Sequence, residues 1–302
     1  MIPLIKSILI TLIISSLFGD RPYVVVLGIA QDGGAPHAGC EKSCCIELWE
    51  SGKKEKVSSI GIVNPLTKQS WLFDATPDFP SQYRILTENH NTELVGIFLT
   101  HAHMGHYTGL LHLGREVMGK KNVPVYAMSR MKRFLETNGP WSQLVTLKNI
   151  NLKLIENNKD IKIGEQLFIE PFLVPHRDEY SETVGYRIIG KEKSLAFIPD
   201  IDKWEKWHGS IFQLALNTDI LLLDGTFYSQ NEIPHRNMAE IPHPFIIESM
   251  ETLSELNSEN RSKIHFIHFN HSNPAIKDNS PAYHTIKSKR FNLAREGDRF
   301  NL

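Results

Sequence analysis

The feature that most constrains this chain is a group of three histidines that directly follows an apolar segment. Residues 95–99 (Val-Gly-Ile-Phe-Leu) are typical of a buried strand, and the histidines are His101, His103 and His106. In a turn that leaves a strand, neighbouring side chains can converge without a regular period. Because neutral imidazoles bind zinc and iron well, the group predicts a transition-metal site. A histidine-rich loop without metal is the alternative.

Three further side chains with metal-binding chemistry follow in order along the chain. His176, Asp200 and His268 each lie at the end of an apolar, strand-like segment. Taken singly, a strand-end histidine such as His176 is more often a structural residue than a ligand, and a turn residue is the alternative for the aspartate. The order of the whole set is therefore the stronger observation.

In this order of residues the sequence resembles the metallo-β-lactamase superfamily of metal-dependent hydrolases, whose signature is His-x-His-x-Asp-His after a strand. The resemblance implies catalytic zinc, as one or two ions, with iron or manganese as alternatives. It implies that one ion is held by three histidines and a second by two, and that an aspartate bridges them as a catalytic residue. The implied residues are His101, His103 and His176 for the first ion, His106 and His268 for the second, and Asp200 for the bridge.

Two more catalytic roles are implied by the same resemblance. Asp74, at the end of the strand-like segment 70–74, would orient the ligand loop, since metal-binding imidazoles need their second nitrogen held. His243, in the sequence Ile-Pro-His-Pro, would face the substrate and donate a proton to a leaving group. A surface-loop histidine is the alternative for His243. Arg177 and Lys203 are close in sequence to expected ligands and offer positive charge for a phosphate.

The chain departs from the signature at one position, because Gly105 stands where the superfamily has aspartate. The second metal would then be left with His106, His268, Asp200 and waters. We therefore expect the second site to be weak or vacant. The chemistry would then be mononuclear, iron-based or lost.

Three cysteines, Cys40, Cys44 and Cys45, cluster near the N-terminus. An odd, clustered set does not favour a framework of disulfides. The glycine-rich loop that leads into the cysteines, and the segment 268–274, resemble two branches of the superfamily. One branch acts in pyrroloquinoline-quinone biosynthesis, and the other contains the phosphodiesterases of phosphonate metabolism.

That closer resemblance implies a structural zinc held by Cys40, Cys44, Cys45 and His271. Three cysteines and one histidine form a known closed tetrahedral set. Because adjacent cysteines are an awkward pair of ligands for one ion, His37 is an alternative to one of them. Free buried thiols are the alternative to the whole site.

The alternation of strand-like and helix-like segments predicts an α/β fold. Helices are expected over 110–118 and 128–137, and residues 144–190 are strand-rich. The pattern favours two sheets with helices outside them, the four-layer αββα sandwich of the metallo-β-lactamase fold. No Ser/Gly-rich linker is visible, so residues 20–302 are expected to form a single domain.

Residues 1–19 differ from the rest of the chain. Lys6 precedes an apolar run over 8–14, and small residues follow, which is typical of a secretory signal peptide. We therefore expect a periplasmic or secreted protein with no stable membrane insertion after cleavage. An uncleaved membrane anchor is the alternative.

The charge pattern and the resemblance together suggest the kind of partner. The 302 residues have a formal net charge of −1 and no long Lys/Arg block, so no nucleic-acid partner is expected. The resemblance implies a small-molecule substrate and hydrolysis of a phosphodiester or related ester. One alternative is iron-dependent oxidation of a tyrosine-derived precursor in quinone-cofactor synthesis. Another is a non-catalytic metal or ligand binder. The oligomeric state stays open.

Overall fold

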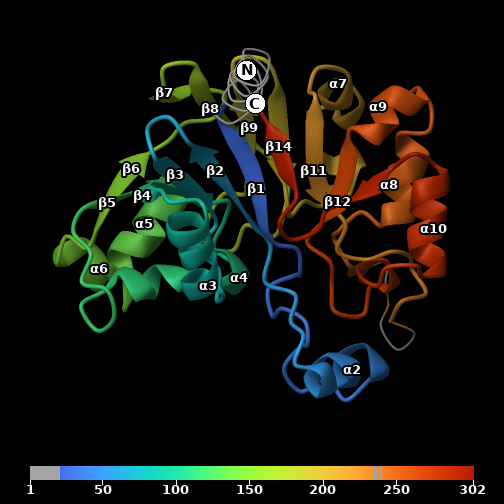
Figure 1. The fold of residues 1–302 in the computed structure, drawn as a ribbon, viewed down its shortest axis with the longest axis horizontal. Helices are drawn as coiled ribbons and strands as arrows, with labels where there is room; N and C mark the ends of the chain where they lie inside the picture. The colour runs from blue at the N-terminus through green and yellow to red at the C-terminus, as the bar shows by residue number, and fades with distance from the viewer. Residues whose placement is uncertain (1–20, 234–236, 238–239) are drawn as a thin grey trace, which may run out of the picture.

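Two seven-stranded mixed sheets form the centre of the molecule (Figure 1). The structure is a computed structural model that describes residues 21–233, 237 and 240–302. In sheet order, the first sheet contains Arg299–Asn301 (β14), Tyr23–Gly28 (β1), Ser59–Asn64 (β2), Gln69–Phe73 (β3), Glu93–Phe98 (β4), Val123–Ala127 (β5) and Ile150–Leu154 (β6). The second contains Asn292–Leu293 (β13), Ile264–Ile267 (β12), Ile220–Asp224 (β11), Ser194–Ile198 (β10), Val184–Ile189 (β9), Leu167–Leu173 (β8) and Ile161–Gly164 (β7).

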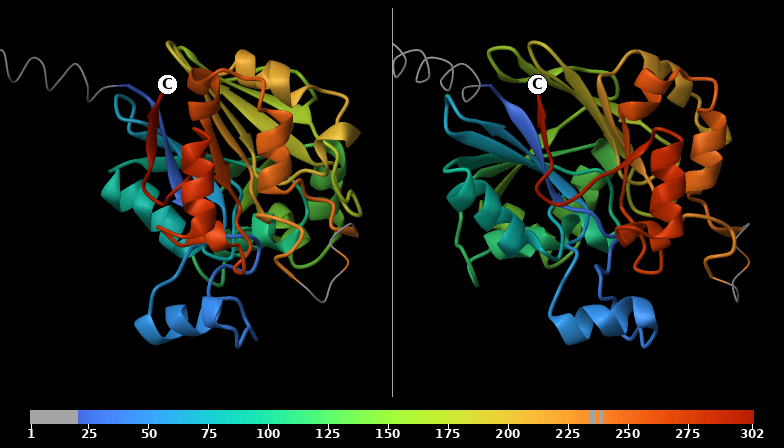
Figure 2. Two further views of the ribbon diagram at one scale, coloured as in Figure 1. Left: turned by 90° about the vertical axis from the view of Figure 1, so that its right-hand side faces the viewer. Right: turned by 45° about the vertical axis from the view of Figure 1, so that its right-hand side comes forward.

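Helices cover the outer face of each sheet, as Figures 1 and 2 show. Those on the first sheet are Phe79–Arg84 (α3), Met104–Tyr107 (α4), Ser129–Thr137 (α5) and Trp141–Thr146 (α6). Those on the second sheet's side are Ile211–Leu216 (α7), Ile246–Thr252 (α8), Ser258–Ser262 (α9) and Pro281–Ser288 (α10). Short helical turns span Ile85–Asn89 (η1), Thr108–Leu113 (η2), Trp204–Lys206 (η3) and Pro274–Ile276 (η5). The predicted αββα sandwich is confirmed.

Alternation along the strands explains the layering. On β3, Trp71 and Phe73 pack into the core between the sheets, whereas Leu72 packs under the helices of the first sheet. The rings of Phe73 and Phe98 stack with centroids 5.0 Å apart, and Tyr186 of the second sheet meets Phe73 edge-on at 5.2 Å. These buried aromatic contacts join the sheets into one core.

The direction of the strands determines where a site forms. Strands β3 to β6 are mutually parallel, and so are β10 to β13. Parallel strands present their carboxyl ends at the same edge, which is where α/β proteins usually bind ligands. The residues singled out by the sequence follow the carboxyl ends of β3, β4, β8, β10 and β12. The fold therefore gathers them at one edge.

Two expected elements differ in the structure. The helix predicted over 110–118 is replaced by η2 and turns. Gly109, just before this range, packs closely on the loop after β3, since a Cβ there would lie 2.2 Å from the carbonyl oxygen of Thr76. The strand-rich region predicted from residue 144 begins only at Ile150, because α6 occupies the preceding residues. The helix predicted over 128–137 is confirmed as α5.

An arm containing Ser43–Ser51 (α2) projects from the body of the sandwich, as all three ribbon views show (Figures 1 and 2). Helix α2 ends at Gly52, whose φ of 66° is a left-handed conformation that glycine adopts without penalty. The predicted signal peptide over 1–19 lies outside the described residues. Within residues 21–233, 237 and 240–302, every helix is too short or too polar to cross a bilayer.

Candidate metal centre

The first cluster of ligands, which we call the three-histidine site, consists of His101, His103, His176 and Asp200. Each offers one ligand atom, and the four atoms lie within 4.8 Å of one another. Nε2 of His101 is 2.8 Å from Nδ1 of His103 and 3.3 Å from Oδ2 of Asp200. Nε2 of His176 is 3.2 Å from the other oxygen, Oδ1 of Asp200. The structure thus brings together the side chains that the sequence assigned to the first metal.

The second cluster, which we call the two-histidine site, consists of His106, His268 and Asp32. Oδ1 of Asp32 is 3.1 Å from Nε2 of His106 and 3.9 Å from Nε2 of His268. His106 Nε2 is also 3.9 Å from Oδ2 of Asp200, so that carboxylate faces both clusters. The set expected from the sequence has waters, and not this carboxylate, beside the two histidines. Asp32 is not among the expected residues, although it lies in the loop that follows the buried strand β1.

The outward-facing ring nitrogens are held by a second set of side chains. Asp74 Oδ2 is 2.8 Å from Nδ1 of His106, and Asp74 also accepts hydrogen bonds from the backbone N–H and hydroxyl of Thr100. The remaining partners are Thr100 for His101, Asp202 for His176, Thr226 for His268 and Glu179 for His103. These contacts leave the inner nitrogens aimed at the centre. Such partners orient metal-binding histidines and increase their basicity.

The inner atoms of the two clusters test whether the residues fit a metal. Among the described residues, buried polar atoms without a hydrogen bond include five at this centre: Nε2 of His106, His176 and His268, and Oδ1 of Asp32 and Asp200. An unsatisfied buried polar atom costs about 1–3 kcal/mol. A native fold that gathers five at one point is explained if a cation binds them. Imidazole and carboxylate donors suit zinc, iron and manganese.

Charge around the centre favours ligand-ready protonation states for several groups. Although burial opposes ionisation, His176 and His243 hold the pKa of Asp200 well below its usual range. Burial and the neighbouring His106 hold the pKa of His101 well below its ordinary value, so this ring is neutral. In contrast, burial is outweighed at His106, whose pKa is raised well above its usual value by Asp74 and Asp32. A cation at the two-histidine site would replace the proton between His106 and Asp32.

Two residues at the centre have left-handed backbones. Asp74 has a φ of 64° and His268 a φ of 66°. This conformation costs a non-glycine residue on the order of 1–2 kcal/mol, and such strain clusters at functional sites. Both residues lie where a strand ends, and the turn aims their side chains at His106 and Asp32 respectively.

His243 lies at the same centre rather than on the surface. It is buried, and its Nδ1 is 2.9 Å from Oδ2 of Asp224 and 3.1 Å from Oδ1 of Asp200. Burial lowers the pKa of this ring, but the two carboxylates outweigh it and raise the pKa to about 10. The three side chains form a third cluster with ligand atoms within 4.8 Å of one another.

The cysteines gather at the base of the α2 arm. Sγ of Cys45 is 3.3 Å and Sγ of Cys44 is 3.7 Å from Nδ1 of His271, and Cys40 Sγ is 3.9 Å from Cys44 Sγ. All three cysteines are free. Burial, His37 and Lys42 lower the pKa of His271 to about 4, so its imidazole is neutral. His37 stacks on His271, with ring centroids 4.5 Å apart, and lies outside the group of convergent ligand atoms.

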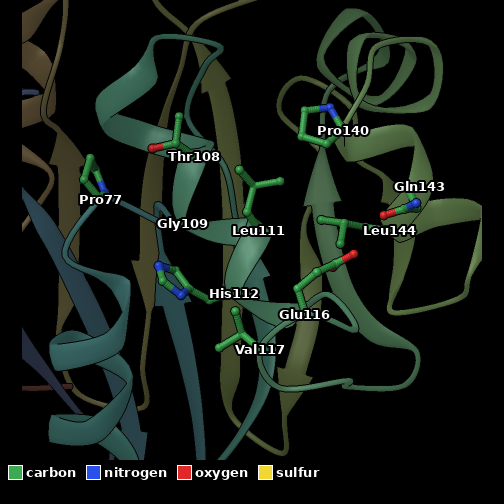
Figure 3. A pocket seen from close by; sticks show the side chains of 10 residues that line it. All are labelled: Pro77, Thr108, Gly109, Leu111, His112, Glu116, Val117, Pro140, Gln143 and Leu144. Carbon is green, nitrogen blue, oxygen red and sulfur yellow. The ribbon is translucent and has the colours of Figure 1, made fainter.

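The other sequence candidates lie elsewhere. Lys203 forms an ion pair with Glu248 and lies 3.8 Å from the centre of the Phe245 ring, so its charge is already partnered. Arg177 is exposed. A separate surface hollow lies beside η2 and α6, lined by Thr108, His112 and Gln143 among others (Figure 3). None of the clustered ligands lines this hollow, so we assign it no part in the metal centre.

Comparison with known proteins finds a matching family and several relatives. Residues 70–269 match the family described as Beta-lactamase superfamily domain. Coenzyme PQQ synthesis protein B of Methylococcus capsulatus is 26% identical over 306 residues, which cover 90% of this chain and 97% of that protein. The protein of the same name from Acinetobacter baumannii (strain ACICU) is 25% identical, covering 93% of this chain and 100% of that one.

Two solved structures share the fold. Zinc-bound PqqB from Methylobacterium extorquens superposes with a TM-score of 0.77 at 22% identity, over 93% of this chain and 100% of that chain. A diphosphatase from the PhnP family superposes with a TM-score of 0.62 at 20% identity, over 93% and 97% of the two chains.

Proposed function

The chain belongs to the beta-lactamase superfamily, and from that membership we propose that it is a metal-dependent hydrolase of a phosphodiester or related small ester. The observation that carries the proposal is the pair of adjacent ligand clusters, both faced by the Asp200 carboxylate, that contain buried, unsatisfied nitrogen and oxygen atoms. The structural likeness to a diphosphatase of the PhnP family supports a phosphate ester as the substrate class.

Separate groups of residues would bind the metal, border the substrate entrance and orient the metal-binding imidazoles. His101, His103, His106, His176, His268, Asp32 and Asp200 would hold the metal. When bound, zinc, iron or manganese supplies Lewis acidity and lowers the pKa of a bound water toward neutrality. The side chains of His103 and Asp32 are 14% and 26% exposed, so we assign the substrate entrance to their side of the centre. Asp74 and Asp202 keep the imidazoles oriented.

His243 is the residue that we assign to the leaving group. Its Nδ1 faces Asp224 and Asp200, so the proton for a departing oxygen would come from Nε2. General acid catalysis of this kind contributes about 10²–10⁴-fold to a rate. Proton donation by His243 should therefore matter much for an alkoxide leaving group and little for a nitrophenolate, which needs little protonation.

The test compares hydrolysis of bis(4-nitrophenyl) phosphate by the purified, the chelator-stripped and the reloaded protein. We expect stripping to abolish hydrolysis, and zinc or manganese to restore it. His101→Ala should lower the rate by at least about 10³-fold, since metal assistance is worth several kcal/mol. An exposed histidine gives the matched control, His208→Ala. Absence of hydrolysis by the fully loaded protein over a range of diesters would overturn the proposal.

A second candidate function rests on the curated relatives, which are named for PQQ synthesis and match over 90% or more of this chain. In that case the same centre would use iron to oxidise a tyrosine-derived precursor, because histidine and carboxylate ligands also suit non-haem iron. Oxygen consumption by the Fe(II)-loaded protein with a tyrosine derivative tests it. Iron-dependent oxygen uptake without diester hydrolysis favours oxidation. The absence of both activities favours a non-catalytic binder.

We also propose that Cys40, Cys44, Cys45 and His271 hold a structural zinc. The support is the convergence of their ligand atoms within 4.8 Å and the neutral His271 ring. Cys40→Ser should lower the zinc content and the melting temperature, since a closed site of this type stabilises the fold directly. Ser43→Ala, on the same arm, is the control. Undiminished zinc in Cys40→Ser contradicts the site.

Export to the periplasm or the medium, with removal of residues 1–19, stays our proposal for localisation. The support is the sequence pattern of a signal peptide. N-terminal sequencing of the protein recovered from each cell fraction tests it. A mature chain that begins near residue 20 outside the cytoplasm supports export. Full-length protein in the membrane fraction indicates the anchored alternative.

A further inference from the structure

Gly105 and Asp32 compete for the same space. A Cβ built on Gly105 would lie 2.2 Å from Oδ1 and 2.6 Å from Cα of Asp32. Real Cβ atoms essentially never approach other heavy atoms this closely, and the Asp32 backbone cannot move aside as a flexible side chain can. The absence of a side chain at residue 105 is therefore a condition for the observed position of Asp32.

The Asp32 carboxylate also points where a ligand is needed. Its Oδ1 is buried and without a hydrogen bond, and it lies 3.1 Å from Nε2 of His106 and 3.9 Å from Nε2 of His268. Both of these nitrogens are likewise buried and without a hydrogen bond. Three atoms with lone pairs thus converge on one point, each from a different segment of the chain.

The loop that carries Asp32 is fixed to the segment that carries His268. The backbone N–H of Gln31 donates to the carbonyl of Phe269 at 2.8 Å, and the N–H of Phe269 donates to the carbonyl of Ile29 at 2.7 Å. The Asn270 amide also donates to Oε1 of Gln31 at 2.9 Å. These bonds join the residues just before Asp32 to the residues just after His268, so the two segments are held against each other. A ligand must be held in this way to bind metal tightly.

We propose that Asp32 is the carboxylate ligand of the two-histidine site, supplied by the loop after β1 in place of an aspartate at residue 105. This inference rests on the metal centre of the proposed function. It makes the centre fully dinuclear, with Asp32 and Asp200 as its two carboxylates, rather than mononuclear. The missing aspartate of the sequence motif is therefore relocated and not lost.

The test is zinc binding, which needs no substrate. Zinc per chain is measured after equilibrium dialysis, and zinc affinities are measured by competition with a chromophoric chelator. Asp32→Ala should lose one ion per chain or bind it at least about tenfold more weakly, because even outer partners of ligands are worth 10–100-fold. Asp278→Asn, which removes an exposed carboxylate paired with Arg295 away from the centre, should bind as the wild type does.

A double variant that moves the carboxylate from residue 32 to residue 105 separates the loss of a ligand from the loss of the folded structure. Gly105→Asp alone should bind zinc poorly, because its side chain collides with Asp32. Asp32→Gly combined with Gly105→Asp should restore the lost ion. Circular dichroism confirms that each variant is folded.

The outcomes separate this inference from the proposed function. If Asp32→Ala keeps the full complement of zinc at wild-type affinity, Asp32 is only an ion-pair partner of His106 and the inference is wrong. If the wild type binds no zinc at the three-histidine site either, the proposed function itself fails. Full zinc binding by wild type and the double variant, with loss in Asp32→Ala, supports the inference.

Discussion

The Asp200 carboxylate faces both the three-histidine and the two-histidine site, yet the two sites gather their remaining side chains in different ways. The first takes His101, His103 and His176 from the ends of β4 and β8, all with ordinary backbone conformations. The second combines His106 with His268, whose backbone is left-handed, and with Asp32 from the loop after β1, which is distant in sequence from both histidines. The first site is thus built by strand ends, and the second depends on a loop fixed by long-range contacts.

The two sites also differ in how deeply the partners of their histidines are buried. The outer partner of His106 is Asp74, which is fully buried, whereas Asp202 beside His176 is 14% exposed and Glu179 beside His103 is 50% exposed. A carboxylate screened by water contributes little, and a buried one contributes much more. Each partner can be removed singly, which gives a graded series of tests.

The largest effect is expected where the two sites meet. Asp200→Asn removes the carboxylate that faces His101, His106 and His176. Zinc should be lost from both sites, and diester hydrolysis should fall by at least about 10³-fold, since metal assistance is worth several kcal/mol. Zinc analysis and steady-state kinetics measure this. Loss of only one ion would show that the sites do not depend on a common carboxylate.

Asp74→Asn should distinguish the sites. The amide keeps an oxygen for the Thr100 N–H but loses the charge beside Nδ1 of His106. We expect zinc at the two-histidine site to bind about 10–100-fold more weakly, while the three-histidine site changes less. A chelator competition that resolves two affinities measures both. Equal weakening at both sites contradicts the separate roles.

The exposed partners should matter less, in the order of their exposure. Asp202→Asn should weaken zinc binding at the three-histidine site by about tenfold. Glu179→Gln should change it by no more than about threefold, because an exposed pair is worth only about 0–1 kcal/mol. The same competition assay applies to both variants. A larger effect from Glu179→Gln than from Asp202→Asn would contradict the claim that a more buried partner contributes more to zinc affinity.

The smallest effect on metal binding is expected at His265, a half-buried histidine on β12 that belongs to neither site. Burial and Lys287 lower the pKa of His265 to about 4. The pKa of a histidine in the unfolded chain is about 6.5. As the pH falls from this value toward the pKa of the folded state, the unfolded chain binds a proton that the folded chain does not, so the free energy of unfolding decreases.

His265→Phe removes this proton linkage without touching a ligand. The variant should keep its zinc, and its free energy of unfolding should drop about 2–3 kcal/mol less than that of wild type between pH 7 and pH 4. Urea unfolding at several pH values measures it. The exposed His208→Phe is the control. Parallel pH profiles for wild type and His265→Phe contradict the linkage.

The sequence predicts the three-histidine site better than the two-histidine site for a physical reason. His101 and His103 lie directly after an apolar run, so local spacing reveals them. Asp32 lies in a Gln-Asp-Gly-Gly segment that is equally typical of an ordinary turn. The role that we propose for Asp32 rests on the packing of that loop against Gly105, which exists only in the folded chain.

The same limit applies to the fold. The two sheets follow from apolar, β-branched segments such as residues 23–28, whose strand is β1. The range 110–118, expected as a helix, is a short helical turn followed by turns, and Gly109 before it packs against the loop that contains Thr76. Propensity describes only local preference, which tertiary packing overrides in many proteins.

Counting metal ions in wild type and His101→Ala tests the central claim most directly. Inductively coupled plasma mass spectrometry of the purified proteins gives the identity and number of ions per chain. The account predicts that wild type holds metal at the histidine centre and zinc at the cysteines. His101→Ala should lose the first and keep the second, and the exposed control His208→Ala should keep both. A His101→Ala protein with the full wild-type complement of metal would contradict the account.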